Sequence, residues 1–292
     1  MDLNALLDRQ AILQPVRWPY FEKGGISVTV LREDLRHPIL GGNKLWKLKY
    51  NLQRAAAEGH KTVVSFGGAY SNHLLALSEA CRMSGLHFHA IVRGEEAPVN
   101  DRLHFMEKAG SRLHFISRDD YRRKSDAEFV RVLLERTGIT QEALVIPEGG
   151  NNAEGQYGCR ELGALIPDSA QWVACAIGTA GTICGMIGGL ADATCALGVT
   201  VVRSGDEPET LMDRIGVPAG RYRIIKGYEA GGYGKSSPEL SAFCERFSIE
   251  TGIPLEPVYS GKLFFAVSDL AEKGYFRRGE ELVILHSGGI FR

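Results

Sequence analysis

Hydrophobic and polar positions alternate along the chain in blocks of two kinds. Short apolar runs rich in β-branched residues predict strands, and longer amphipathic segments that end at glycine predict helices. The predicted strands cover residues 25–31, 61–66, 88–94, 111–116, 143–147, 172–177 and 199–203. The predicted helices cover the opening stretch, 71–85, 101–110, 126–138, a segment from about residue 156, and an apolar segment that ends at residue 190. Residues 118–129 mix both signs of charge, which predicts a solvated loop that leads into a helix.

This order of elements predicts an α/β protein built from βαβ units with parallel sheets flanked by helices. The segments VVSF and WVACAI are apolar throughout or nearly so, as in sheets that are covered on both faces. A chain of 292 residues can bury a sizeable core as one large domain or two smaller ones. The most regular block predicts a small α/β domain at 52–145, inserted into a large domain formed by 1–51 and 146–292.

Composition narrows the classes of function. The formal net charge is -1, so charge provides no reason to expect nucleic acid as a partner. No apolar run approaches the roughly 18–20 residues that span a bilayer, and no charged-then-apolar leader begins the chain. We therefore expect a cytoplasmic protein with no membrane partner. The six cysteines lack CxxC spacing, which favours buried reduced thiols, and the HFH alternation at 87–89 favours a half-buried strand over a metal site.

Three predicted strand-to-helix turns are rich in glycine: SFGGAYSNH at 65–73, IPEGGNN at 146–152 and AIGTAGTICG at 176–185. In parallel α/β sheets, ligands bind at the carboxyl ends of strands, where helix N-termini present unpaired N–H groups. The third turn offers backbone N–H groups and two hydroxyls, which suit a phosphate dianion as well as an ordinary tight turn. It matches neither the P-loop nor GxGxxG. Its central residues are Gly178, Thr179, Ala180, Gly181 and Thr182.

The first turn ends in Ser71, Asn72 and His73 at a predicted helix start. A serine or asparagine there is expected as an N-cap, and the same groups can also bind a substrate carboxylate. The segment GGNKLWKLKY adds three lysines, at 44, 47 and 49, and the residue pattern alone selects none of them. A phosphate-type turn, a carboxylate-type turn and a lysine after Gly-Gly-Asn in one chain suggest an amino-acid site with a phosphorylated cofactor.

These motifs together resemble those of a known family. LREDLRHPILGGNKLWKLKYNL, SFGGAYSNH, IPEGGNN, IGTAGT, EPVYSGK and HSGGI look like the D-cysteine desulfhydrase / 1-aminocyclopropane-1-carboxylate (ACC) deaminase family, in family order from about residue 12 to residue 290. The resemblance implies a two-domain fold type II enzyme, similar to the tryptophan synthase β subunit. It implies pyridoxal 5′-phosphate as cofactor and a small amino acid as substrate. We also expect a homodimer.

The resemblance selects one lysine. The lysine of the family's GNK motif binds the cofactor covalently, and it corresponds to Lys44. A place at the beginning of a helix suits this role, because the positive end of the helix dipole disfavours an ammonium and helps to keep the amine nucleophilic. Lys47 and Lys49 lie further along the helix, and we expect both to be solvated surface residues.

Other roles follow from the resemblance position by position. Asn72 corresponds to the asparagine that hydrogen-bonds the ring oxygen of the cofactor. Ser71, with the N–H groups of Asn72 and His73, corresponds to the site for the substrate carboxylate, and residues 178–182 correspond to the phosphate loop. Tyr233 and Tyr259 align with two active-site tyrosines, so we count them with Lys44 and Ser71 as catalytic candidates, and we also assign Tyr259 to substrate binding.

Two positions bear on the reaction. In relatives that open the cyclopropane ring, the residue after the motif tyrosine is glutamate and the HxGG block carries leucine. Here these positions are Ser260, which we assign to substrate binding, and Ser287, which we assign to the cofactor. A carboxylate keeps the pyridine nitrogen of the cofactor protonated, whereas a hydroxyl only hydrogen-bonds it. The weaker electron sink still suffices when a good leaving group departs from Cβ, which favours β-elimination.

The sequence therefore predicts an enzyme that converts D-cysteine to pyruvate, hydrogen sulfide and ammonia. An elimination enzyme that acts on another amino acid, such as a D- or L-serine derivative, stays open, and an ACC deaminase that forms 2-oxobutanoate and ammonia is the first alternative. A protein that binds the cofactor or an amino acid without turnover is the second. A nucleotide-dependent oxidoreductase with the same α/β pattern is the third.

Overall fold

The computed structural model describes residues 3–94, 100–139, 142–202, 208–232 and 234–290. The strands are β1 (Leu13–Val16), β2 (Ser27–Leu31), β3 (Thr62–Gly68), β4 (His87–Arg93), β5 (Arg112–Ile116), β6 (Leu144–Ile146), β7 (Trp172–Ile177), β8 (Cys195–Thr200), β9 (Tyr222–Ile225) and β10 (Glu281–Leu285). The helices are α1 (Leu3–Leu7), α2 (Pro19–Gly24), α3 (Asn43–Ala57), α4 (Asn72–Ser84), α5 (Asp101–Lys108), α6 (Arg118–Arg122), α7 (Ala127–Arg136), α8 (Ala153–Gly163), α9 (Gly181–Ile187), α10 (Pro208–Arg214), α11 (Pro238–Thr251) and α12 (Ser260–Glu272). Short 3₁₀ turns occur at η1 (Glu33–Leu35), η2 (Glu148–Gly150) and η3 (Ala219–Arg221).

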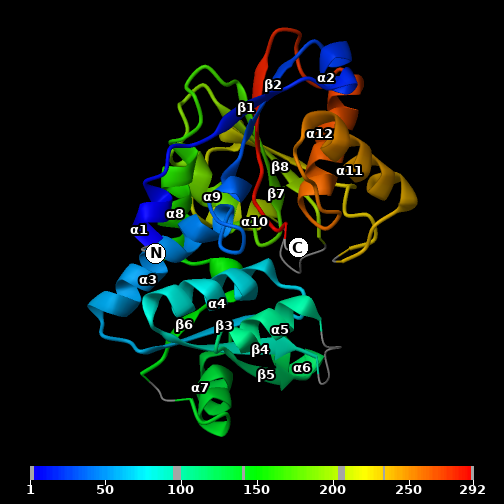
Figure 1. Ribbon diagram of the computed structural model, residues 1–292. Coiled ribbons are helices and arrows are strands. Elements are labelled where there is room, and N and C mark those ends of the chain that lie inside the picture. The colour runs from blue at the N-terminus through cyan, green and yellow to red at the C-terminus, as the bar shows by residue number, and fades with distance from the viewer. Residues whose placement is uncertain (1–2, 95–99, 140–141, 203–207, 233, 291–292) are drawn as a thin grey trace.

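Two sheets organise these elements, one above the other in the view of Figure 1. The six-stranded sheet has the order β1-β2-β10-β7-β8-β9, and the four-stranded sheet has the order β5-β4-β3-β6. Neighbouring strands run parallel except for the pair β1 and β2. The α/β class with predominantly parallel sheets is thus confirmed.

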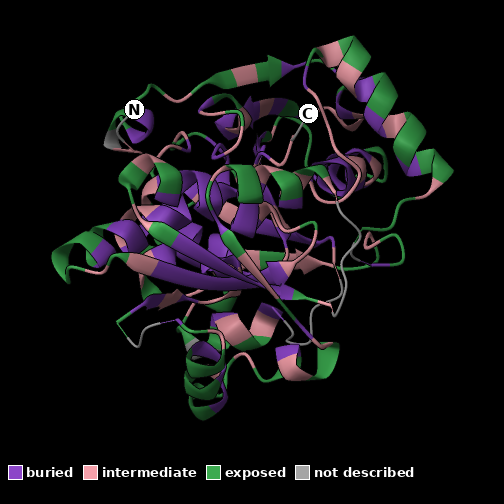
Figure 2. Ribbon diagram, turned by 60° about the horizontal axis from the view of Figure 1, so that its bottom comes forward, coloured by how far each residue is buried: buried purple, intermediate pink, exposed green. Residues whose placement is uncertain are grey.

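Each sheet is covered on both faces, as its apolar strands predict. One face of the six-stranded sheet packs on α2, α11 and α12 through aromatic residues that include Phe247 and Phe264. One face of the four-stranded sheet packs on α6 and α7 around Phe66 and Phe129. The remaining faces of both sheets share one continuous core with α3, α4, α8 and α9. Figure 2 shows buried strands at the centre of the molecule, whereas the edge strand β1 has one buried residue.

Several predicted boundaries shift in the structure. The strand predicted at 199–203 is the end of β8, which begins earlier and stops at Thr200. The helix predicted from about residue 156 begins at Ala153, because the Asn152 side chain caps it by accepting a hydrogen bond from the N–H of Gly155. The segment predicted as a solvated loop contains the short helix α6, whose Tyr121 is buried. The apolar helix predicted to end at 190 ends at Ile187.

The small sheet takes all of its strands from the chain between β3 and β6. The division into 52–145 and 1–51 plus 146–292 stays a prediction. All six cysteines are free, and five of them are buried. Within the described ranges, no helix is long and apolar enough to cross a membrane, and no three metal-ligating side chains gather.

Candidate active site

Lys44 lies in the first turn of α3, one residue after the helix begins. The turn before it requires glycine, because Gly42 has φ +88° and a Cβ atom there would lie 2.0 Å from the carbonyl oxygen of Ser287. The C-terminal segment and the start of α3 therefore pack backbone to backbone. Lys44 Nζ donates a hydrogen bond to Asn43 Oδ1 at 2.8 Å, and Asn43 Nδ2 donates to Thr182 Oγ1 at 2.7 Å. Asn43 thus links the lysine to the third glycine turn.

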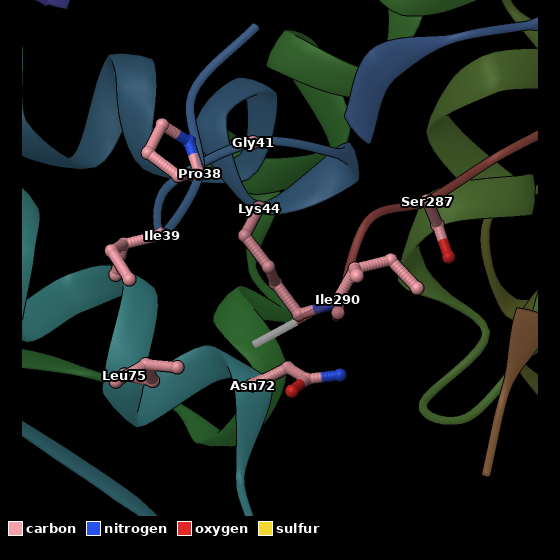
Figure 3. A pocket seen from close by; sticks show the side chains of 9 residues that line it. Pro38, Ile39, Gly41, Lys44, Asn72, Leu75, Ser287 and Ile290 are labelled. Atoms are coloured by element: carbon pink, nitrogen blue, oxygen red, sulfur yellow. The ribbon is translucent and has the colours of Figure 1, made fainter. Parts of the chain in front are cut away.

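The Lys44 side chain also lines a small cavity, where Figure 3 shows it extending from α3 toward Asn72. The rest of the wall comes from the segment before α3, from α4 and from the C-terminal segment: Pro38, Ile39, Gly41, Asn72, Leu75, Ser287, Gly289 and Ile290. Burial, followed by the positive charge of Lys47, lowers the pKa of Lys44 to about 7. Near neutral pH a substantial fraction of Lys44 is therefore the free, nucleophilic amine.

The prediction that Lys47 is a solvated surface residue is wrong. Its side chain is buried, and Nζ donates a hydrogen bond to the carbonyl oxygen of Gly149 at 2.9 Å. A Cβ atom at Gly181 would lie 3.2 Å from this Nζ, so the amine lies beside the third glycine turn. Burial lowers the pKa of Lys47. The signal for this placement was the three-residue spacing from Lys44, which puts both side chains on one side of the helix.

Lys49 is also less exposed than predicted. Its side chain is 19% exposed, and Nζ forms an ion pair with Glu161 of α8. The neighbouring Tyr50 bonds the same carboxylate. Lys49 therefore helps to join α3 to α8 and does not face the cavity.

The third glycine turn connects β7 to α9 and has the features of an anion site. Ala180 adopts a positive φ of 58°, and Thr182 is buried. Asn151, from the second glycine turn, donates through Nδ2 to the carbonyl oxygen of Thr179 at 3.0 Å. Asn151 Oδ1 is buried, and no partner for it is found among the described residues. A buried amine from Lys47, a hydroxyl and backbone N–H groups meet here, which suits a phosphate group.

The first glycine turn starts α4, as predicted. Ser71 is the N-cap, and its Oγ accepts a hydrogen bond from the N–H of Leu74 at 3.2 Å. His73 follows in the first helical turn, and its Nε2 lies 2.9 Å from Ser65 Oγ. Burial, together with the charges of the α3 lysines, lowers the pKa of His73 well below its ordinary value. His73 Nδ1 is buried without a partner in the described part of the chain.

Tyr259 and Ser260 lie at the start of α12. A Cβ atom at Gly178 would lie 3.6 Å from Tyr259 Cε1, so the tyrosine ring lies against the third glycine turn. Ser260 is 1% exposed, and its Oγ accepts a hydrogen bond from the backbone N–H of Glu256 at 2.9 Å. The Glu256 carboxylate accepts hydrogen bonds from the N–H groups of Val258, Tyr259 and Ser260 at 2.7–2.8 Å. Ser260 is not part of the cavity wall.

The structure places the predicted site residues as follows. Lys44, Asn72 and Ser287 line one cavity, and Asn43 links Lys44 to Thr182 of the third glycine turn. Ser71 and His73 lie at the start of α4, next to Asn72, and Tyr259 lies against the third glycine turn. Ser260, the first residue of α12, is bonded to Glu256. Tyr233 lies outside the described residues.

This arrangement defines a class of protein: an α/β enzyme with a nucleophilic lysine, a phosphate-type turn and a capped helix start at the carboxyl ends of parallel strands. The chain belongs to the pyridoxal-phosphate dependent enzyme family, whose model matches residues 14–288. The predicted cofactor, pyridoxal 5′-phosphate (PLP), is thus confirmed, and the protein is a PLP-dependent lyase or deaminase.

The relatives include proteins named for each of the two activities in the predicted family. A protein of Pyrococcus horikoshii, provisionally named a 1-aminocyclopropane-1-carboxylate deaminase, is 30% identical over 91% of this chain and 85% of its own length. A D-cysteine desulfhydrase of Yersinia enterocolitica is 28% identical over 91% of this chain and 87% of its own. The crystal structure of an ACC deaminase homologue has a TM-score of 0.83 and 27% identity, and the match covers 99% of this chain and 94% of that one.

The residues present fit this cofactor. Lys44 would supply the amine for its aldehyde group, and the buried Lys47 with the third glycine turn would suit its phosphate. A buried amine whose one hydrogen-bond partner among the described residues is a carbonyl oxygen leaves donor capacity for an anion. The unpartnered, buried Asn151 Oδ1 and His73 Nδ1 are likewise consistent with a site that is completed by a bound group.

Proposed function

We propose that this protein catalyses the β-elimination of D-cysteine to pyruvate, hydrogen sulfide and ammonia. The observation that carries the proposal is the start of α12, where the residue after Tyr259 is a buried serine, bonded to Glu256, instead of a carboxylate that faces the cofactor. The 28% identity to a D-cysteine desulfhydrase supports the same reading. The net reaction adds one water to D-cysteine, so it requires no oxidant or reductant.

The roles of the residues follow from the chemistry. Bound PLP supplies an electron sink for the negative charge that develops at the substrate Cα. In the proposal, Ser71 and the first N–H groups of α4 hold the substrate carboxylate, because a capped helix start favours anions. Lys44, with its pKa lowered to about 7, removes the Cα proton near neutral pH. Tyr259 protonates the departing thiolate.

The cofactor contacts in the proposal come from the surrounding turns. Residues 178–182 and Lys47 bind the phosphate, Asn72 donates to the ring oxygen, and Ser287 faces the ring. In the proposal, the position after Tyr259 presents no carboxylate to the pyridine nitrogen, so that nitrogen stays largely neutral. The resulting electron sink is sufficient for expulsion of a thiolate from Cβ but weak for opening a cyclopropane ring. We further propose that the enzyme is a homodimer located in the cytoplasm. Sedimentation tests the oligomeric state, and cell fractionation tests the location.

A second candidate function is ACC deamination to 2-oxobutanoate and ammonia. The 30% identity to the Pyrococcus horikoshii protein favours it. The two functions differ in their products, because ring opening retains a four-carbon chain whereas β-elimination releases sulfide and leaves three carbons.

A substrate panel tests the proposal. Purified protein loaded with PLP is incubated with D-cysteine, L-cysteine, D-serine and ACC, and keto acid and sulfide are measured. Pyruvate together with sulfide from D-cysteine is the expected result. Formation of 2-oxobutanoate from ACC without sulfide from D-cysteine would establish the second candidate in its place.

A matched pair of lysine variants tests the role of Lys44. Lys44→Ala is expected to lose both the visible absorbance of the lysine-bound cofactor and all turnover. Lys23→Ala removes an exposed lysine whose recorded partner is Glu272, and it is expected to retain both. Retained turnover in Lys44→Ala would show that another group is the nucleophile.

A further inference from the structure

The beginning of α5 forms hydrogen bonds to the turn that carries Asn72. Asn100, the N-cap of α5, donates through Nδ2 to the carbonyl oxygen of Ala69 at 3.2 Å. Arg102, two residues later, donates through Nη1 to the carbonyl oxygen of Tyr70 at 2.6 Å and also to Asn72 Oδ1. Two side chains at the start of one helix therefore bond three residues of the first glycine turn, Ala69, Tyr70 and Asn72.

The contact with Arg102 determines which way the Asn72 amide faces. A guanidinium group can only donate hydrogen bonds, so the amide atom beside it is the acceptor Oδ1. If the amide were reversed, the N–H groups of Asn72 would face those of Arg102 and the hydrogen bond would be lost. The other amide atom, Nδ2, is thereby left to act as a donor on the opposite side.

The opposite side is the C-terminal segment and the cavity. A Cβ atom at Gly289 would lie 2.7 Å from Asn72 Nδ2, and Gly289 adopts φ +90°, so only glycine leaves room for the amide here. Asn72 and Gly289 both line the cavity into which Lys44 extends (Figure 3). The donor of Asn72 thus lies in the same cavity wall as the amine of Lys44.

We propose that Arg102 is a positioning residue that holds the Asn72 amide with Nδ2 toward the ring oxygen of the cofactor. This inference rests on the proposed role of Asn72 in binding PLP. Arg102 acts through Asn72 and does not touch the cofactor. Because its hydrogen bond to Oδ1 is charge-assisted, it restrains the amide more strongly than a neutral donor. An N–H donor at the ring oxygen stabilises negative charge there, which affects both the affinity for PLP and the pH at which the bound cofactor changes colour.

The test compares Arg102→Met with Arg122→Met, which removes an exposed arginine of α6 whose recorded partner is Asp119. The readouts are the Kd for PLP and the pH midpoint of the visible absorbance, both measured without substrate. Arg102→Met is expected to bind PLP roughly three- to tenfold more weakly, as for the weakening of the one neutral hydrogen bond that Asn72 Nδ2 donates to the ring oxygen, and to move the midpoint upward. Arg122→Met is expected to match the wild type in both.

A double-mutant cycle separates positioning from a general structural effect. In an Asn72→Ala background, the substitution Arg102→Met is expected to cause no further shift of the midpoint, because the amide that it orients is absent. An equal shift in both backgrounds would overturn the inference, as would an unchanged Kd and midpoint in Arg102→Met. If circular dichroism shows that Arg102→Met does not fold, Arg102→Lys replaces it in the test. This variant carries a single ammonium and is expected to show a smaller upward shift of the pH midpoint. No shift of the midpoint in Arg102→Lys would overturn the inference. Wild-type protein that shows no absorbance with PLP would instead count against the proposed function.

Discussion

The buried Lys47 provides the sharpest test of how this protein binds the phosphate of its cofactor. Replacing it by methionine keeps most of the side-chain volume and removes the ammonium. Within the described part of the chain, Nζ has one hydrogen bond, to the carbonyl oxygen of Gly149, and it lies beside the backbone of Gly181. The substitution should therefore affect the protein without cofactor and the protein with cofactor in different ways.

The two effects can be estimated separately. Without PLP, Lys47→Met loses one hydrogen bond to a charged group, worth about 1.5–3 kcal/mol, but it also removes the unfavourable burial of a positive charge. We expect these contributions largely to cancel in the free energy of unfolding. With PLP, the variant leaves a buried phosphate without its ammonium partner, which costs about 2–5 kcal/mol. This corresponds to a roughly 30- to 5000-fold weaker affinity for PLP.

The assay is fluorescence or absorbance titration with PLP, alongside urea denaturation of the cofactor-free protein. Lys49→Met is the matched control, because it removes a lysine from the same helix that is paired with Glu161 and lies away from the cavity. It should bind PLP as the wild type does. Equal affinity in Lys47→Met and Lys49→Met would refute the assignment of Lys47 to the phosphate.

Three other predictions concern stability and geometry. Gly42→Ala should lower the free energy of unfolding by about 2 kcal/mol or more, because the new Cβ would collide with backbone atoms. The control Gly59→Ala, at φ +74° with open space around it, should lower the free energy of unfolding by only about 1 kcal/mol. Equal losses in urea denaturation would contradict this prediction. Glu256→Gln should lower Tm and the rate of product formation with little change in the Kd for PLP. The carboxylate accepts hydrogen bonds from the N–H groups at the start of α12 through both oxygens, whereas an amide offers one acceptor oxygen. An unchanged Tm would count against this prediction. Burial and the charge of His114 lower the pKa of His89 from 6.5 to about 4, so the unfolded chain binds the proton first and stability falls as the pH drops from 6.5 toward 4. In His89→Gln that loss should be smaller, and an identical pH dependence in urea denaturation would exclude the explanation.

Local pattern was sufficient for the central elements of both sheets. The segments VVSF and WVACAI are apolar nearly throughout, and both are strands of covered parallel sheets. The helix at 71–85 was recognisable because Ser71 caps its start and Gly85 ends it in a left-handed conformation. These signals depend on neighbouring residues in the chain, so they are readable without tertiary structure.

Other elements carry weaker local signals. The pattern of apolar residues did not single out β1, β9 or β10, although β10 lies between β2 and β7 at the centre of the larger sheet. Its pairing joins the C-terminal segment to strands that are more than 100 residues away in the sequence. The antiparallel pairing of β1 is likewise set by contact with β2 and not by its own pattern.

The sequence alone determined the α/β class, the three glycine turns, the capped start of α4 and, through its motifs, the cofactor and Lys44 as the candidate nucleophile. Tertiary structure decided which groups surround that lysine. It buried Lys47 beside the third glycine turn, bonded Ser260 to Glu256, and brought Arg102 of α5 onto Asn72. The physical reason is that burial, and the pKa changes that follow from it, depend on residues far apart in the chain. Helical spacing shows which side chains share a face, but only packing against other elements shows whether that face meets water, protein or a ligand.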